Sequence, residues 1–148
     1  MRVVIFDEKV FIMANTLYIN IRKAMLLANF NWEQDTLKVM LVDSTYTMQN
    51  THEFLSDIPT SARIANPVTL EECTVTADGA ADARDCTFPS VQNDGRTVAR
   101  ILIFKDTGTP ETSPLVAYID TATGLPLTPN GGDIIIVWDN GVNKIFRP

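Results

Sequence analysis

The only imidazole available for catalysis in this 148-residue chain is His52, because no other histidine occurs in the sequence. Nucleophilic catalysis by a hydroxyl or thiol needs an adjacent base of that kind. No Gly-x-Ser-x-Gly turn is present to hold a serine in a strained, exposed position. We therefore expect a surface or capping role for His52, and the sequence predicts no catalytic residue.

Carboxylates are plentiful, with 18 Asp and Glu residues, but none lies in a motif for paired acid–base catalysis. Asp78-Gly79 with Asp82 and Asp85 superficially resembles a calcium-binding loop, yet the spacing departs from the D-x-[DN]-x-[DN]-G pattern. Gly131-Gly132 lacks the Lys and Ser/Thr that complete a phosphate-binding loop, and it precedes a predicted strand. The sequence predicts neither a metal nor a cofactor.

The two cysteines, Cys73 and Cys86, are equally distant from the Gly79-Ala80 turn, so they could face one another across a hairpin. Both occupy strand-like positions, and in a reducing compartment we expect two buried free thiols. Two Cys and one His also supply too little material for a zinc site or a disulfide scaffold.

The composition describes one folded domain with an acidic surface. The chain is 45% hydrophobic and 20% charged, and its length is typical of a single domain that folds without a metal or disulfide. A net charge of −6 argues against a general nucleic-acid binder, which needs a basic face. No apolar run approaches the roughly 18 residues of a membrane span, so we expect no specific nucleic acid and no membrane among its partners.

The sequence predicts one helix, which packs against the rest of the chain. We expect it to begin about Leu17, with Asn15 or Thr16 as the N-cap, and to end at Asn29-Phe30-Asn31. Apolar residues at i, i+4, i+7, i+8 and i+11 predict a core-facing stripe, which comprises Leu17, Ile21, Ala24, Met25 and Ala28.

From Thr36 onward the pattern changes to short β-branched segments separated by turn residues. We expect a hairpin around Asn93-Asp94-Gly95, between Val91 and Val98. The fold class predicted is mainly β, a β-sandwich or jelly-roll-like domain of about eight strands with one N-terminal α-helix. The expected strands are 37–42, 61–68, 69–76, 85–88, 97–105, 114–120, 132–138 and 142–147.

Two segments leave alternatives open. Residues 133–138 form a continuous apolar run, which indicates a strand covered on both faces, by the second sheet and the helix or by a neighbouring subunit. Residues 1–13 form either an N-terminal arm that pairs with another sheet edge or an overlong start preceding Met13. Residues 14–148 then form a single β-rich domain. Asp7-Glu8-Lys9 interrupts the apolar start, which is unlike a signal peptide.

The charge excess is confined to one part of the chain. Residues 1–48 carry five basic and five acidic side chains, so the whole net charge of −6 lies in residues 49–148. Part of this negative charge lies in one predicted hairpin, where acidic residues flank Arg84 in the sequence. Two interpretations remain: a solvated loop that aids solubility, or an acidic patch for a basic partner surface. The acidic residues are Glu71, Glu72, Asp78, Asp82 and Asp85.

Six segments of the sequence carry a resemblance to known proteins. They are DTLKVMLVD (35–43), HEFLSD (52–57), ARDCTF (83–88), IFKDTG (103–108), SPLVAYID (113–120) and PNGGDI (129–134). With these segments the chain resembles a family of small tailed-bacteriophage virion structural proteins. The likeness covers about residues 14–147, and Cys86 stands where a valine-like residue is expected. The resemblance implies a structural component made in the host cytoplasm and incorporated into the virion, with no catalytic motif to transfer.

By analogy of class, phage proteins of this size and β content are most often capsid decoration (cement) proteins or small tail, neck or baseplate parts. We expect a decoration protein that binds and stabilises the outer shell. The alternative is a small tail, neck or baseplate protein, with a receptor- or carbohydrate-binding face. A cell-wall hydrolase dependent on His52 is the remote third hypothesis. The partners expected are the major capsid protein or other virion proteins and further copies of the chain. The expected contact residues are Val3, Val4, Ile5 and Phe6 in the arm, Glu71, Glu72, Asp78 and Asp82 in the acidic hairpin, and Lys144, Phe146 and Arg147 near the C-terminus.

Overall fold

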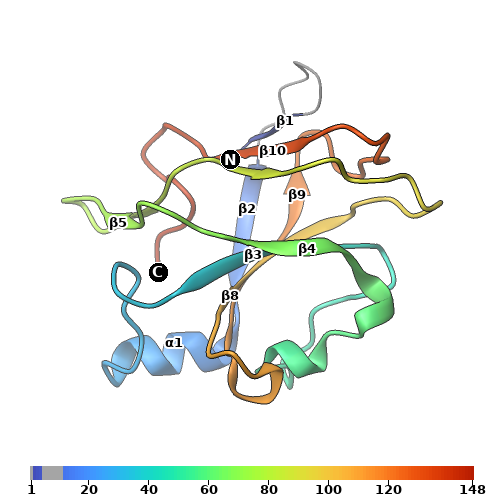
Figure 1. Cartoon of the computed structure of the whole chain (residues 1–148). Coiled ribbons are helices and arrows are strands. Elements are labelled where there is room, and N and C mark those ends of the chain that lie inside the picture. The colour runs from blue at the N-terminus through green and yellow to red at the C-terminus, as the bar shows by residue number, and fades with distance from the viewer. Residues whose placement is uncertain (1, 5–11) are drawn as a thin grey trace.

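The computed structural model describes residues 2–4 and 12–148, with side chains from Thr16 onward. Within these residues the chain is mainly β, with 34% strand and 13% helical residues, which confirms the predicted fold class. The strands form a five-stranded, a three-stranded and a two-stranded sheet, and the helix α1 lies at one end of the large sheet (Figure 1).

The five-stranded antiparallel sheet is the centre of the fold, in the order β2-β9-β8-β3-β4. In its three central strands nearly every residue is buried, so both faces of this sheet are covered. Their continuous apolar sequences explain why strict alternation is absent. The bounds are β2 Ile12–Leu17, β9 Leu115–Ala122, β8 Arg100–Lys105, β3 Leu37–Val42 and β4 Arg63–Thr69.

The three-stranded antiparallel sheet has the order β1-β10-β7, with β1 at Arg2–Val4, β10 at Ile134–Val137 and β7 at Cys86–Phe88. The expectation that the second sheet and the helix cover both faces of residues 133–138 is wrong. Ile134 and Ile136 are buried, whereas Ile135 is 36% exposed. Successive side chains of a strand point to opposite faces, and the described residues bury only the face of β10 that carries Ile134 and Ile136.

Both sheets contribute to one hydrophobic core. Trp138, directly after β10, and Phe88 in β7 are fully buried, as are Leu41 and Ile103 in the large sheet. The indole Nε1 of Trp138 donates to the carbonyl oxygen of Arg84 at 2.9 Å, so its polar atom is satisfied.

The helix α1 spans Ile19–Leu26, later and shorter than predicted. Its N-cap is Tyr18, so the assignment of Asn15 or Thr16 as the cap is wrong. Both of those residues lie in β2, where pairing with β9 prevails over local capping preference. Ile21 is buried and Ala24 and Met25 pack against the core, as the stripe predicted.

Ala28 does not belong to that stripe, because it is exposed at a φ of 56° directly after the helix ends. A residue in the left-handed region commonly terminates a helix. Three short 3-10 helices follow along the chain, at Leu55–Asp57, Thr60–Ala62 and Pro110–Thr112.

Three further expectations about local structure differ from what is observed. Residues 142–147 form no strand; only an isolated bridge joins Ala81 to Phe146. The strand expected over 69–76 is absent as such: Thr69 ends β4, and only Thr74–Val75 forms a further strand, β5, which pairs with β6, Ala81–Asp82. The turn at Gly95 exists, but Val91 and Val98 bond to Gly132 and Leu127 and not to each other. That turn therefore connects the small sheet to the large one and forms no hairpin.

Candidate interaction surfaces

His52 belongs to a small aromatic cluster. Its Nδ1 lies 3.0 Å from the Tyr46 hydroxyl, and the two rings stack. The Tyr46 hydroxyl also lies 2.8 Å from that of Tyr18, whose pKa is raised chiefly by burial. These three groups satisfy one another's hydrogen bonds and tie the loop after β3 to the residue preceding α1. The geometry therefore indicates that His52 holds the loop after β3 in place through Tyr46.

The acidic hairpin and the C-terminal segment, predicted as separate contact regions, lie against each other. Arg147 pairs with the Asp78 carboxylate and donates to the Asp78 carbonyl oxygen at 2.9 Å. Lys144 lies 3.4 Å from the Asp82 carboxylate. Each expected contact segment therefore neutralises charge on the other, which reduces what either can offer to a partner.

Phe146 is not available as a contact residue in this structure. It is only 4% exposed, and its ring meets that of Trp32 edge to face at 5.2 Å. The Phe146 carbonyl oxygen accepts a hydrogen bond from the Ala81 amide at 2.9 Å. The apolar ring thus anchors the C-terminal segment to the core.

The N-terminal arm pairs with its own chain. Val3 lies opposite Ile136 and Val4 opposite Ile135, so β1 extends the small sheet at β10. The expected contact residues Ile5 and Phe6 lie outside the described residues. The arm was expected to pair with the edge of another sheet. In this structure β1 is an edge strand that pairs with β10 of its own chain.

The calcium-like carboxylates do not converge. Asp78 and Asp82 pair with Arg147 and Lys144, and the Asp85 carboxylate accepts from the Trp138 amide at 2.8 Å. In residues 16–148, no group of three or more His, Cys, Asp or Glu side chains is placed to hold a metal ion.

Both cysteines are free thiols, as expected, but the expectation that both are buried in strands is wrong for Cys73, which is only partly buried and directly precedes β5. Cys86 is buried, and burial first, then the Asp85 charge, raises the pKa of its thiol to about 12. Burial also raises the pKa of Cys73 to about 11. Elevated values favour the protonated thiol, which is a poor nucleophile at neutral pH.

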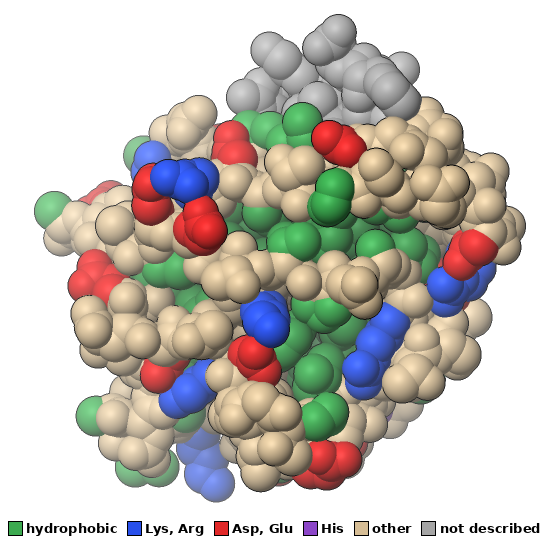
Figure 2. Space-filling view, in the orientation of Figure 1, with side chains coloured by type: hydrophobic (Ala, Val, Ile, Leu, Met, Phe, Trp, Pro, Cys, Tyr) green, Lys and Arg blue, Asp and Glu red, His purple; other side chains and the backbone are tan. Residues whose placement is uncertain are grey.

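A feature that the sequence analysis did not assign is the outward face of α1, comprising Ile19, Arg22, Lys23, Leu26 and Leu27. These residues recur at i, i+3, i+4, i+7 and i+8, so they share one side of the helix. Leu26 is 88% exposed and Leu27 63% exposed. The side chains of Arg22 and Lys23 form no ion pair with any described residue. Figure 2 shows hydrophobic and basic side chains together over α1.

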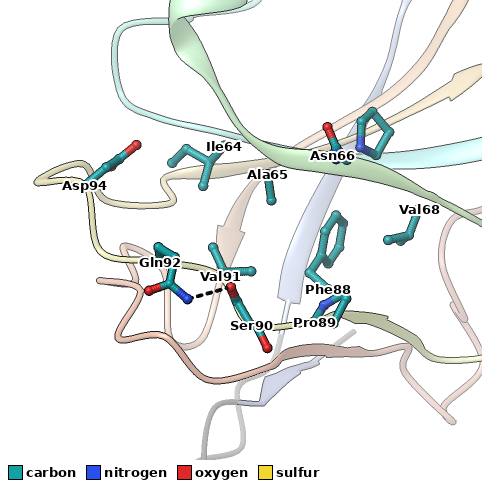
Figure 3. A pocket seen from close by; sticks show the side chains of 11 residues that line it. Ile64, Ala65, Asn66, Val68, Phe88, Pro89, Ser90, Val91, Gln92 and Asp94 are labelled. Atoms are coloured by element: carbon teal, nitrogen blue, oxygen red, sulfur yellow. Dashed lines mark hydrogen bonds between the residues drawn. The ribbon is translucent and has the colours of Figure 1, made fainter.

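A second unassigned feature is a groove between the edge strands of the two main sheets, here called the β4–β7 groove. Its first hollow, of about 490 Å³, is bounded by β4 and by the chain that follows β7. Ile64, Val68, Phe88 and Val91 make much of its lining apolar, and Figure 3 shows Phe88 and Val91 lying between the two segments. Figure 2 shows hydrophobic side chains across the middle of the same face of the molecule.

The second hollow of the groove, of about 480 Å³, shares Val68 with the first and is charged. Arg84 bonds Glu71 at 2.7 Å and also pairs with Glu72, so two carboxylates share one guanidinium. Asp85 adds a third carboxylate, which forms no ion pair with a described residue. We call Glu71, Glu72 and Asp85 the acidic end of the groove.

The contacts of the Asp78 carboxylate can be tested through the pKa of that group. The Thr76 hydroxyl, followed by Arg147, lowers the pKa of Asp78 to about 2. Because the folded-state pKa is depressed, this contribution to stability is present above about pH 4 and is lost as the pH falls toward 2. We expect Thr76→Val and Arg147→Ala each to raise the Asp78 pKa, because each removes a hydrogen bond to the carboxylate, as followed by NMR titration of the carboxyl carbon.

Asp94 is the internal control for that titration, because Arg96 lowers its pKa independently of the hairpin. Its titration should be unchanged in both variants. An Asp78 pKa near the ordinary value of about 4 in the unmodified chain would show that the hairpin and C-terminal segment are not joined as described.

No protein-family model matches the chain, and no curated protein proves significantly similar to it. Among the described residues, none of the helices has the length and apolar character needed to cross a membrane.

Proposed function

We propose that the protein is a non-enzymatic structural component of a tailed-phage particle, acting as a capsid decoration protein on the outer shell. The observation that carries the proposal is the exposed apolar and basic face of α1. An exposed stripe with two leucines and two cations that form no ion pair with a described residue is typical of a protein–protein contact surface. Among the described residues, in contrast, the carboxylates of Asp78 and Asp82 pair with Arg147 and Lys144, and no group of three or more His, Cys, Asp or Glu side chains converges.

The resemblance to small phage virion proteins supports this proposal. Its matching segments include all of β3 and β7 and parts of β8 and β9, so they cover core strands as well as loops. A cement protein needs a robust small fold with an adhesive surface, because it holds neighbouring capsid subunits against the pressure of packed DNA. The alternative proposal is a small tail, neck or baseplate protein, in which the same surface would join ring or fibre neighbours.

The experiment is the copy number of the protein relative to the major capsid protein in purified virions, measured by quantitative mass spectrometry. We expect hundreds of copies, because a decoration protein occupies repeated sites over the shell. A count on the order of three to twelve would instead support the tail, neck or baseplate proposal, since rings at one vertex hold few copies. Absence from the particle would overturn both.

A further inference from the structure

We propose that the outward face of α1 in one copy docks into the β4–β7 groove of a second copy, in a head-to-tail contact. Arg22 and Lys23 would face the acidic end of the groove, and Leu26 and Leu27 would enter its apolar hollow. This contact uses the helix-in-groove mode of recognition, with anchors at i, i+3, i+4 and i+7.

Charge complementarity identifies the occupant. The acidic end of the groove has three carboxylates, Glu71, Glu72 and Asp85, for the single guanidinium of Arg84. The outward face of α1 carries two cations without a described ion-pair partner, as shown above. A symmetric contact between two α1 faces would instead bring like charges together, which is unfavourable. The pairing of α1 with the groove is therefore the self-association that the charges favour.

The dimensions of the two surfaces also agree. The outward face runs from Ile19 to Leu27, about 12 Å along a helix axis. The β4 residues from Ile64 to Thr69 extend about 16 Å along the groove, and Glu71 follows two residues later. The cations precede the leucines by one helical turn, and the acidic end of the groove adjoins the apolar hollow at Val68. One helix face can thus reach both hollows at once.

The edge of β4 favours docking by side chains over addition of a strand. Ala65 has a φ of 59°, and the register between β3 and β4 shifts at this point. Pro67 follows and has no amide hydrogen to donate to an added strand. Such features protect an edge from strand addition. The occupant of the groove is accordingly a helix face.

The two surfaces lie on different parts of the molecule, as Figure 1 shows for α1 and β4. One copy therefore cannot fill its own groove, and each copy retains one unfilled surface of each kind after a single contact. Contacts of this heterologous type close into rings or continue as open chains. The inference concerns self-association only and does not depend on where the protein resides in a particle.

The test is sedimentation velocity of the purified full chain at low and high salt, with three variants. We expect a concentration-dependent oligomer that weakens at high salt. Arg22→Glu with Lys23→Glu should weaken association at least about tenfold, as should Leu26→Ser. Val142→Ser is the matched control, because Val142 is 73% exposed outside both surfaces and its loss should change nothing.

A mixing experiment distinguishes head-to-tail from symmetric association. The Arg22→Glu/Lys23→Glu variant retains an intact groove, and a Val68→Arg variant retains an intact helix face. Each alone should be monomeric, with an unchanged circular dichroism spectrum, and the equimolar mixture should form one-to-one dimers. A monomeric unmodified chain, helix variants that associate normally, or a mixture that stays monomeric would each overturn the inference. The copy number in virions is a separate measurement, so a failure of this inference can be distinguished from a failure of the proposed function.

Discussion

Replacing Trp138 by alanine is expected to lower the free energy of unfolding by about 3–5 kcal/mol, the range for large aromatic residues removed from a core. Trp138 is 2% exposed, and its indole donates to the Arg84 carbonyl oxygen. The substitution leaves a cavity between the sheets and removes the partner of a backbone carbonyl group. Urea unfolding monitored by far-ultraviolet circular dichroism measures the loss directly.

Two companion variants make that prediction decisive. Trp138→Phe keeps most of the apolar volume and is expected to lose less stability, so it remains measurable if Trp138→Ala does not fold. Val142→Ala is the exposed control, with an expected change within about 0.5 kcal/mol. A loss for Trp138→Ala as small as that of the control would show that the indole does not hold the small sheet onto the core.

The sequence predicted the fold class because hydrophobic periodicity reports local burial well. The strand 37–42 and the buried side of α1 followed from that pattern, and both are present. The failures have a common physical cause, which is pairing between segments distant in sequence. Asn15 and Thr16 have good capping side chains, but β9 recruits them into β2. Residues 142–147 look like a strand, yet the described sheets leave them a single bridge to Ala81.

The candidate surfaces were harder to predict for the same reason. The charged contact candidates in the hairpin and the C-terminal segment were recognised from the sequence, but only the fold shows which of them meet. Arg147 pairs with Asp78, and Lys144 pairs with Asp82. The outward face of α1 has a readable period, whereas the exposure of Leu26 depends on which neighbours cover the helix. The β4–β7 groove joins two sheet edges and has no local sequence signal.

Alkaline pH is expected to destabilise the protein strongly through Cys86 and Tyr18. Burial raises the pKa of both groups, and that of Cys86 reaches about 12. The folded state therefore holds protons that the unfolded state releases above about pH 8.5 for a thiol and about pH 10 for a tyrosine. The stabilising contribution is complete below those values and is lost as the pH rises, by about 1.4 kcal/mol per pH unit for each group.

Cys86→Val isolates the contribution of the thiol, because valine is similar in size and does not ionise. At pH 7 we expect the variant to lie within about 1.5 kcal/mol of the unmodified chain. At pH 11 the variant should have gained about 3 kcal/mol relative to it, since only the unmodified chain must keep a thiol protonated. Urea unfolding at both pH values, with reducing agent present, gives the two differences.

Cys73→Val is the matched control for this titration. Cys73 is only partly buried and its pKa rises to about 11, so its variant should show a smaller change over a narrower range of pH. Tyr18→Phe should remove part of the remaining slope above pH 10, because the buried Tyr18 hydroxyl is then absent. If the difference between Cys86→Val and the unmodified chain is the same at pH 7 and pH 11, the thiol is already solvated in the folded state. The buried position of Cys86 in β7, which forms one wall of the β4–β7 groove, would then be wrong.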